Sequence, residues 1–182
     1  MLRRSVSAII LFLALAMCAS ALAAGRAGMW LDVPFVAQEK DGCGAAAIAM
    51  IMQYWERQQG QSINPEADPA QIFRALYSQP AHGIYASAME NYFLQNGYRA
   101  FAFAGDWADL ERQLEKGRPL VVALKPPSGS SLHYVVVAGI DEPNHLVLVN
   151  DPAQRKLLKL DQYRFEREWN AAGHWLLLAV PR

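Results

Sequence analysis

The fold is decided by one stretch of the sequence, Asp41-Gly42-Cys43-Gly44-Ala45-Ala46-Ala47-Ile48-Ala49-Met50-Ile51-Met52-Gln53-Tyr54-Trp55. Asp41 and the two glycines are typical of a turn that leads into a helix. The residues after them are apolar at almost every position, so we expect a helix over residues 43–58 that lies in the middle of a core. The alanines allow other elements to approach this helix closely.

Cys43 stands at the predicted start of this helix. The unpaired N–H groups and the positive end of the helix dipole favour a thiolate over a thiol at such a position. Cys43 is therefore a candidate nucleophile. Most free cysteines are buried and unreactive, so position alone leaves both interpretations open.

The composition is that of an ordinary globular protein. Of the 182 residues, 53% are hydrophobic and 19% are charged, and 17 basic residues balance 17 acidic ones. This is enough chain for one sizeable core. The lack of net charge and of any basic run argues against a nucleic-acid partner, and the sequence contains no motif for a metal or a cofactor.

Residues 1–24 have the pattern of a secretory signal peptide. Arg3 and Arg4 precede an apolar run over residues 8–17, and small residues suited to cleavage follow it. The run is too short to span a membrane as a helix. We expect cleavage after Ala23 or Ala24 and export to the periplasm or the extracellular space, with no membrane span in the mature chain.

The sequence has two cysteines, Cys18 and Cys43. Residues 15–18 resemble a lipoprotein box, but Met17 stands where a small residue is needed, so lipid anchoring at Cys18 is the less favoured alternative. Cleavage would remove Cys18 and leave Cys43 without a disulfide partner. Exported proteins usually pair their cysteines, so a single thiol is expected to be well buried or used.

The rest of the chain separates into helices followed by strands. After an extended segment over residues 29–36, further helices are expected over residues 70–76, 84–95 and 107–115, with a strand over 98–104. Strands are then expected over 119–124, 134–140, 146–149 and 156–160, followed by a helix over 162–170 and a strand over 174–180. This order predicts an α+β fold, with N-terminal helices packed on a C-terminal antiparallel sheet, as one domain over residues 25–182.

The two valine-rich strands of the predicted hairpin bring a histidine near a carboxylate. Their turn at residues 141–144 folds the region of His133 back onto the region of Asp151. If paired residue numbers sum to 284, these side chains lie opposite each other on one face, whereas a sum of 285 places them on opposite faces. His145 lies roughly 20 Å from Asp151 along the strand and is too distant to be its partner. Asp141 is a rival partner for His133, but its place in the turn suits capping better.

Four segments, taken in order, carry a resemblance to a known family. They are Val33-Pro34-Phe35-Val36-Ala37-Gln38, Asp41-Gly42-Cys43-Gly44-Ala45-Ala46, His133-Tyr134-Val135-Val136-Val137-Ala138-Gly139-Ile140-Asp141 and Asn150-Asp151-Pro152. Together they resemble the papain-like bacteriocin-processing (double-glycine leader) peptidases over essentially the whole mature chain. The resemblance implies a papain-like fold. It also implies Cys43 as the nucleophile, His133 as the general base, Asp151 as the residue that orients it, and Gln38 as the oxyanion donor.

Two positions differ from the family pattern. Members often carry an acidic residue directly before the cysteine or a proline after the following glycine, where this chain has Gly42 and Ala45. The better-known members are cytoplasmic domains fused to export transporters, whereas this chain stands alone behind a predicted signal peptide. The resemblance therefore implies the catalytic set more strongly than specificity for double glycine.

The same chemistry follows from the residue types. His133 within hydrogen-bond reach of Cys43 would hold a thiolate–imidazolium pair, and Asp151 would fix the tautomer through the other ring nitrogen. We expect an exported cysteine peptidase that acts on a peptide or protein substrate without a cofactor. Two alternatives remain: a non-catalytic papain-like module that assists export or assembly of a secreted protein, and an amidase or acyltransferase with the same triad.

Overall fold

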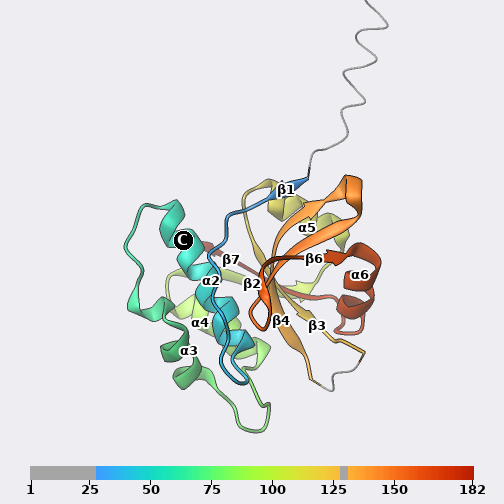
Figure 1. The fold of residues 1–182 in the computed structure, drawn as a ribbon. Helices are drawn as coiled ribbons and strands as arrows, with labels where there is room; N and C mark the ends of the chain where they lie inside the picture. Colours follow the sequence, from blue (N-terminus) through green and yellow to red (C-terminus); the bar gives the residue numbers. More distant parts are fainter. Residues whose placement is uncertain (1–27, 128–130) are drawn as a thin grey trace, which may run out of the picture.

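The computed structural model describes residues 28–127 and 131–182, in which five α-helices pack against a seven-stranded antiparallel sheet (Figure 1). The helices are α2 (Cys43–Gln58), α3 (Pro69–Leu76), α4 (Ala86–Gln95), α5 (Trp107–Glu115) and α6 (Gln162–Asn170), with 3-10 turns η1 (Pro65–Ala67) and η2 (Glu142–Asn144). The strands are β1 (Met29–Trp30), β2 (Tyr98–Ala104), β3 (Leu120–Leu124), β4 (His133–Asp141), β5 (Leu146–Asp151), β6 (Arg155–Asp161) and β7 (Trp175–Pro181). The expected α+β class is confirmed. The predicted signal peptide and Cys18 lie outside the described residues.

The strands are ordered β2-β7-β3-β4-β5-β6. Strand β1 pairs with β4 on the same side as β3, just beyond Leu120, where β3 begins. The consecutive pairing of β3 through β6 follows the sequence expectation. The sequence made no prediction for the place of β7 in the sheet, and this last strand lies between β2 and β3. The sheet therefore joins early and late parts of the chain at its centre.

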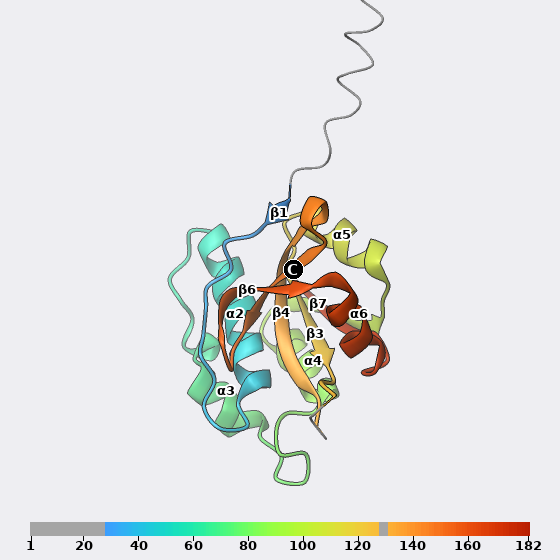
Figure 2. The same ribbon diagram turned by 45° about the vertical axis from the view of Figure 1, so that its right-hand side comes forward.

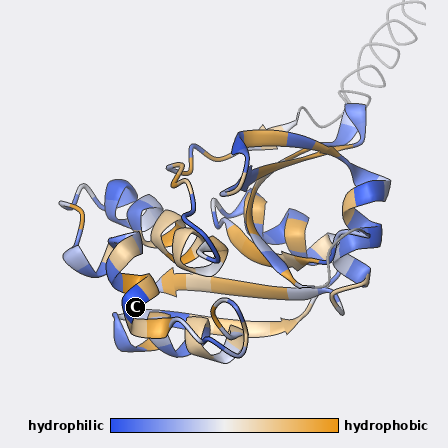
Figure 3. Cartoon of the chain, turned by 60° about the horizontal axis from the view of Figure 1, so that its bottom comes forward, coloured by the Kyte–Doolittle hydropathy of each residue, from blue (hydrophilic) through white to orange (hydrophobic). Residues whose placement is uncertain are grey.

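Helices cover both faces of the sheet. Figures 1 and 2 show α2, α3 and α4 on one side and α5 and α6 on the other, and each side has its own apolar core. The apolar stretches of α2 and the central strands face these cores in Figure 3. Residues Gly44 to Met52 of α2 are all buried, as expected for a helix without a solvent-facing side, whereas Cys43 is half-buried and the last turn is the most exposed part.

Some boundaries differ from the sequence expectation. The predicted extended segment over residues 29–36 forms a strand only at Met29–Trp30, and Pro34 within it has no N–H to donate. Helix α4 begins at Ala86, not at residue 84, because Tyr85 has an extended conformation. Helix α3 begins one residue early, where the Asp68 side chain accepts a hydrogen bond from the Gln71 N–H.

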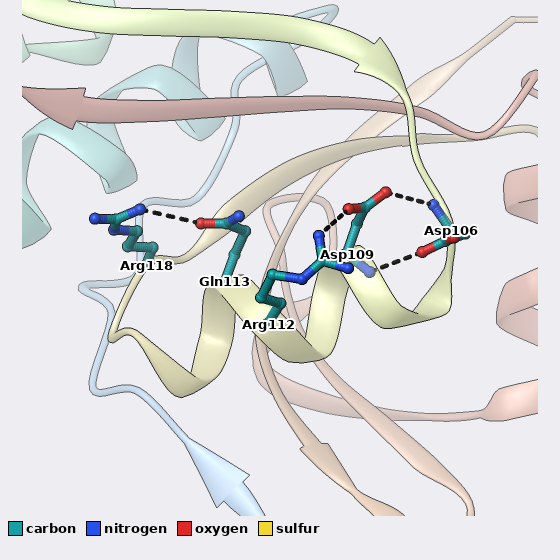
Figure 4. A network of polar contacts seen from close by, with 5 residues as sticks. All are labelled: Asp106, Asp109, Arg112, Gln113 and Arg118. Carbon is teal, nitrogen blue, oxygen red and sulfur yellow. Dashed lines mark hydrogen bonds and ion pairs between the residues drawn. The ribbon is translucent and has the colours of Figure 1, made fainter.

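A capping box fixes the start of α5, as Asp106 predicts. The Asp106 carboxylate accepts from the Asp109 N–H at 2.8 Å, and the Asp109 carboxylate accepts from the Asp106 N–H at 3.1 Å (Figure 4). Arg112 pairs with Asp109 at 2.7 Å, and Arg118 donates to Gln113 at 3.3 Å. The reciprocal bonds of Asp106 and Asp109 satisfy backbone donors at the start of α5 and fix where the helix begins.

The β4–β5 hairpin contains a bulge. Near the turn, the paired residue numbers sum to 287, as for Ile140 with Val147. Beyond the bulge they sum to 286, as for Val136 with Asn150, so Ala138 is the extra residue. Neither register is the one with a sum of 284 that was considered from the sequence.

The bulge decides which side chains share a face. With a sum of 287 throughout, His133 and Asp151 would lie on opposite faces of the sheet. The extra residue Ala138 changes the sum to an even number, so continuing the register places Asp151 opposite Val135. His133 stands two residues from Val135 and therefore on the same face as Asp151. This confirms that His133 and Asp151 share a face of the sheet, although they lie diagonally across the two strands and not directly opposite each other.

Strand β1 lies directly against this bulge. The Leu31 N–H donates to the Ala138 carbonyl at 2.7 Å, and Trp30 pairs with Gly139. A Cβ atom on Gly139 would lie 2.4 Å from the Met29 carbonyl oxygen, so this close approach requires glycine. The chain leaves β1 from here and runs toward the start of α2.

Candidate active site

Cys43 is the first residue of α2 and is half-buried and free. A turn closed by the Gly42 N–H and the Glu39 carbonyl at 3.0 Å precedes it, with Asp41 in the left-handed region at φ 60°. The N-cap is Gly42, and no side chain caps the first turn. The first N–H groups of α2 are thus not used by a capping side chain, which favours negative charge at this position.

Gly44 lets the start of α2 approach strand β4. A Cβ atom at this position would lie 3.1 Å from Cβ of Ile84 and 3.5 Å from the Tyr134 ring. Burial, followed by the charge of Cys43, raises the pKa of Tyr134 to about 12. The cysteine therefore lies beside the first residues of β4.

His133 and Asp151 form a direct contact at 2.8 Å between Nε2 and Oδ1. His133 begins β4 and Asp151 ends β5, and their side chains are 23% and 7% exposed. Asp151 also accepts from the Ala153 N–H at 2.9 Å and from Nε2 of Gln154 at 2.5 Å. The carboxylate is thus held by three donors.

The pKa shifts of this pair agree in sign. Burial lowers the pKa of His133, but hydrogen bonds with Asp151 and Cys43, and the charges of both, raise it to about 9. Burial raises the pKa of Asp151, but hydrogen bonds from His133, Ala153 and Gln154 outweigh it and leave the pKa lowered. Near neutral pH the site therefore holds an imidazolium beside a carboxylate. Because Nε2 contacts Asp151, Nδ1 is the ring nitrogen left for Cys43.

Gln38 lies in the irregular segment before α2. Its N–H donates to the Pro152 carbonyl at 2.9 Å, and its side-chain Oε1 is buried with no hydrogen-bond partner among the described residues. A cavity of about 210 Å³ is lined by Gln38 and by Gly42, the neighbour of Cys43. The structure thus places Gln38 beside the helix start.

The remaining candidates lie elsewhere. Asp141 makes no side-chain cap bond at η2, contrary to expectation, but accepts two bonds from the Asn144 side-chain amide, at 2.9 and 3.0 Å. His145 has a left-handed conformation at the end of that turn. His174 stacks on Trp169 with ring centroids 4.8 Å apart, on the side of α6.

Two polar residues of this region had no role assigned from the sequence. Gln154 holds Asp151, and Asn150 is fully buried with three hydrogen bonds. The signal for Asn150 was present, because an amide that ends an apolar strand must find partners. Gln154 follows a turn and gave no such signal.

A second cavity of about 210 Å³ lies beside the histidine–aspartate pair. Its lining includes His133, Asp151 and Gln154, and it reaches the Arg164–Glu168 ion pair of α6. In the described part of the chain, no group of three His, Cys, Asp or Glu side chains could hold a metal ion. No helix of residues 28–127 and 131–182 is long and apolar enough to cross a bilayer.

Comparisons with known proteins agree with this architecture. The model of the "Peptidase_C39 like family" matches residues 30–176. A comparison with curated proteins gives no significant match.

Several solved structures share the fold. A double glycine motif protease from an AMS/PCAT transporter, solved in complex with the leader peptide, has a TM-score of 0.66 and 21% identity, covering 86% of this chain and 96% of that one. The peptidase domain of Streptococcus ComA, a bi-functional ABC transporter involved in a quorum-sensing pathway, has a TM-score of 0.62 and 21% identity, with coverages of 81% and 97%. A candidate C39-like peptidase from Bacillus anthracis has a TM-score of 0.63 and 19% identity, with coverages of 85% and 98%. At these identities the similarity shows the fold.

Proposed function

This chain belongs to the Peptidase_C39-like family, and from that premise we propose that it is a cysteine peptidase whose catalytic residues are Cys43, His133 and Asp151. One observation carries the proposal. His133 contacts Asp151 at 2.8 Å through Nε2, and Cys43 lies near enough to help raise the pKa of this histidine. A binding module has no need for this linear arrangement of thiol, imidazole and carboxylate.

In the proposed reaction, the Cys43 thiolate attacks the carbonyl carbon of a peptide bond. The His133 imidazolium then gives its proton to the leaving amine, and a thioester remains on the sulfur. Water, deprotonated by the neutral His133, hydrolyses the thioester and restores the thiolate–imidazolium pair. Asp151 keeps the ring oriented and stabilises its charged form throughout.

We assign the oxyanion site to the Cys43 N–H and the Gln38 side-chain amide. The uncapped start of α2 leaves the backbone donor free of a competing side chain. The Oε1 of Gln38 is buried without a hydrogen-bond partner among the described residues, and the proposal turns Nε2 toward the substrate. Loss of one such donor lowers kcat about 10²–10³-fold.

The proposed substrate is a peptide or protein. A related fold was solved as a protease in complex with a leader peptide, and this supports peptide binding in the present chain. Cleavage at double glycine is not part of the proposal. This chain has Gly42 where family members often carry an acidic residue, and Ala45 where they often carry a proline. Export, inferred from residues 1–24, places the reaction outside the cytoplasm.

The test combines thiol labelling with peptide cleavage in the wild type and three variants. Cys43→Ala and His133→Ala should each abolish cleavage to a similar extent, because the residues act as a unit. His145→Ala, which changes a histidine at the far end of the same hairpin, should cleave like the wild type. Iodoacetamide should alkylate Cys43 rapidly below pH 7 and slowly in His133→Ala.

The competing functions give other results. A Cys43→Ala variant that cleaves as well as the wild type would contradict the peptidase assignment and favour the non-catalytic module. Rapid labelling of Cys43 by an acyl electrophile, together with turnover of small amides but not of peptides, would favour an amidase or acyltransferase.

A further inference from the structure

The segment that carries Gln38 belongs to no helix or strand. It leaves β1 at Leu31, which is bonded to Ala138, and its next backbone bond to a distant part of the chain is at Gln38, whose N–H donates to the Pro152 carbonyl. Between them, the Val33 N–H bonds only to the nearby Leu31 carbonyl, and Pro34 has no N–H to donate. The middle of the segment is held by the packing of Val33 in the core beside α2 and by a polar hold from outside the segment.

The side chain of Asn150 supplies that hold. Its Nδ2 donates to the carbonyl oxygens of Val33 at 3.1 Å and Pro34 at 3.3 Å. Its Oδ1 accepts from the Leu157 N–H at 2.9 Å. Asn150, Val33 and Pro34 are all buried, so each lost bond would leave a polar group without water.

A bulge in β6 makes this arrangement available. Val149 pairs with Leu158 and Asp151 with Arg155, so two β6 residues, 156 and 157, stand opposite Asn150. Leu157 has a left-handed conformation, with φ 49°, and its N–H points to the Asn150 side chain.

The same bulge fastens the segment a second time. Lys156, the other residue of the bulge, forms an ion pair with Asp32, which lies one residue before Val33. The bulge therefore holds the segment in two ways: through the buried Asn150 side chain and through the ion pair of Lys156 with Asp32.

Three consecutive residues thus serve two parts of the proposed site. Strand alternation sends the Asp151 side chain toward His133 and the Asn150 side chain to the opposite face, onto the Gln38 segment. The next carbonyl, that of Pro152, accepts from Gln38. The oxyanion donor and the carboxylate are therefore held by one piece of backbone.

We propose that Asn150 is a positioning residue that sets the place of the Gln38 amide in the oxyanion site. The inference rests on the proposed function, because it takes Gln38 as the donor. Asn150 acts through the backbone of residues 33–38, so its effect on the reaction depends on Gln38 being present.

The test is a double-mutant cycle between Asn150→Asp and Gln38→Ala. Asn150→Asp keeps the size of the side chain and the acceptor for Leu157, but it replaces the two donors by a carboxylate oxygen. We expect kcat to fall about 10- to 100-fold with little change in KM, within the loss known for an oxyanion donor. Adding Asn150→Asp to Gln38→Ala should cause no further loss of kcat, because the Gln38 amide that Asn150 positions is already absent.

Two readouts separate positioning from a general structural effect. The alkaline limb of the pH–rate profile and the rate of Cys43 alkylation should remain at wild-type values, since His133, Asp151 and Cys43 are untouched. Asn144→Asp, the same change at the exposed turn of the same β4–β5 hairpin, should leave kcat unchanged. Losses that multiply in the double variant, or slower alkylation in Asn150→Asp, would overturn the proposal.

Stability and the proposed function are tested separately. If Asn150→Asp does not fold, Asn150→Ala enters the same cycle, with the same expected non-additivity. Failure of both to fold would show that Asn150 serves the fold instead of the donor, and would also overturn the proposal. A wild type that cleaves no peptide, or an active Cys43→Ala, contradicts the peptidase assignment before the cycle begins.

Discussion

At the scale of single residues, His133 carries the clearest pH dependence. Its pKa of about 9 exceeds the ordinary 6.5, so the folded protein holds this proton more tightly than the unfolded chain does. The resulting stabilisation is fully present below about pH 6.5 and is lost as the pH rises through about 9. We expect the melting temperature of the wild type to fall over that window more than that of His133→Ala.

The activity should follow the same proton. The imidazolium protonates the leaving amine, so kcat/KM should fall on the alkaline side near pH 9. Asp151→Asn keeps the shape of the partner but removes its charge, so this limb should move to lower pH, with a milder loss of rate than in His133→Ala. A limb that stays in place in Asp151→Asn would contradict the assigned cause of the raised pKa.

Gln154 gives a second prediction at this scale. Its amide donates to Oδ2 of Asp151 at 2.5 Å and helps to lower the pKa of that carboxyl. Gln154 is exposed, so Gln154→Leu should lower the free energy of unfolding at pH 7 by only about 1 kcal/mol. The stabilisation that comes from a lowered pKa is fully present well above the ordinary value of 3.8 and is lost as the pH falls through the lowered pKa, so the difference should be smaller at pH 3 than at pH 7. Urea unfolding at both pH values tests this, with Gln113→Leu on α5 as the control.

At the scale of elements, the bulge beside β1 makes Gly139 a sensitive position. Gly139→Ala would place a methyl group 2.4 Å from the Met29 carbonyl oxygen and push β1 away from β4. We expect a loss of about 1–3 kcal/mol in the free energy of unfolding, together with reduced activity. Gly83→Ala is the control, because the nearest atom to its Cβ would be 3.8 Å away. Equal effects of the two changes in urea unfolding would contradict the role of the close approach.

Sequence periodicity was sufficient for most elements but not for the sheet's irregularities. The apolar run after Cys43 and the capping signal of Asp106 gave the bounds of α2 and α5 as observed. The bulge at Ala138 was not predicted: Gly139 inside the strand is compatible with a bulge or with a close backbone approach, and the distant β1 decides between them. The shared face of His133 and Asp151 was therefore one of two open registers until the structure decided it.

The candidate site divides in the same way. The positions of Cys43, His133 and Asp151 follow from local sequence patterns. Cys43 starts a helix, His133 starts a strand and Asp151 ends one. The hydrogen bonds from Asn150 to Val33 and Pro34 join residues that are 117 and 116 positions apart in the sequence. No local sequence pattern indicates contacts over such a separation.

At the scale of the whole molecule, the proposed export sets the N-terminus of the mature protein. Residues 1–24 predict cleavage after Ala23 or Ala24, so N-terminal sequencing of the protein recovered outside the cytoplasm should begin at Ala24 or Gly25. An Ala23→Leu, Ala24→Leu pair should block processing. A protein that begins at Met1, or one acylated at Cys18, would contradict the prediction.

The central place of β7 also sets the order in which the molecule can be assembled. Strand β2 pairs with β7 through residues at least 71 positions apart, such as Ala104 with Trp175, and β3 pairs with the other edge of β7. A growing chain therefore cannot complete its sheet until β7 has been synthesised, and such long-range pairing is slow. Leu177 and Ala179 of β7 also belong to the core around α2. The thiol of Cys43 would thus remain on an incomplete fold until late in synthesis, which would delay the onset of the proposed peptidase activity.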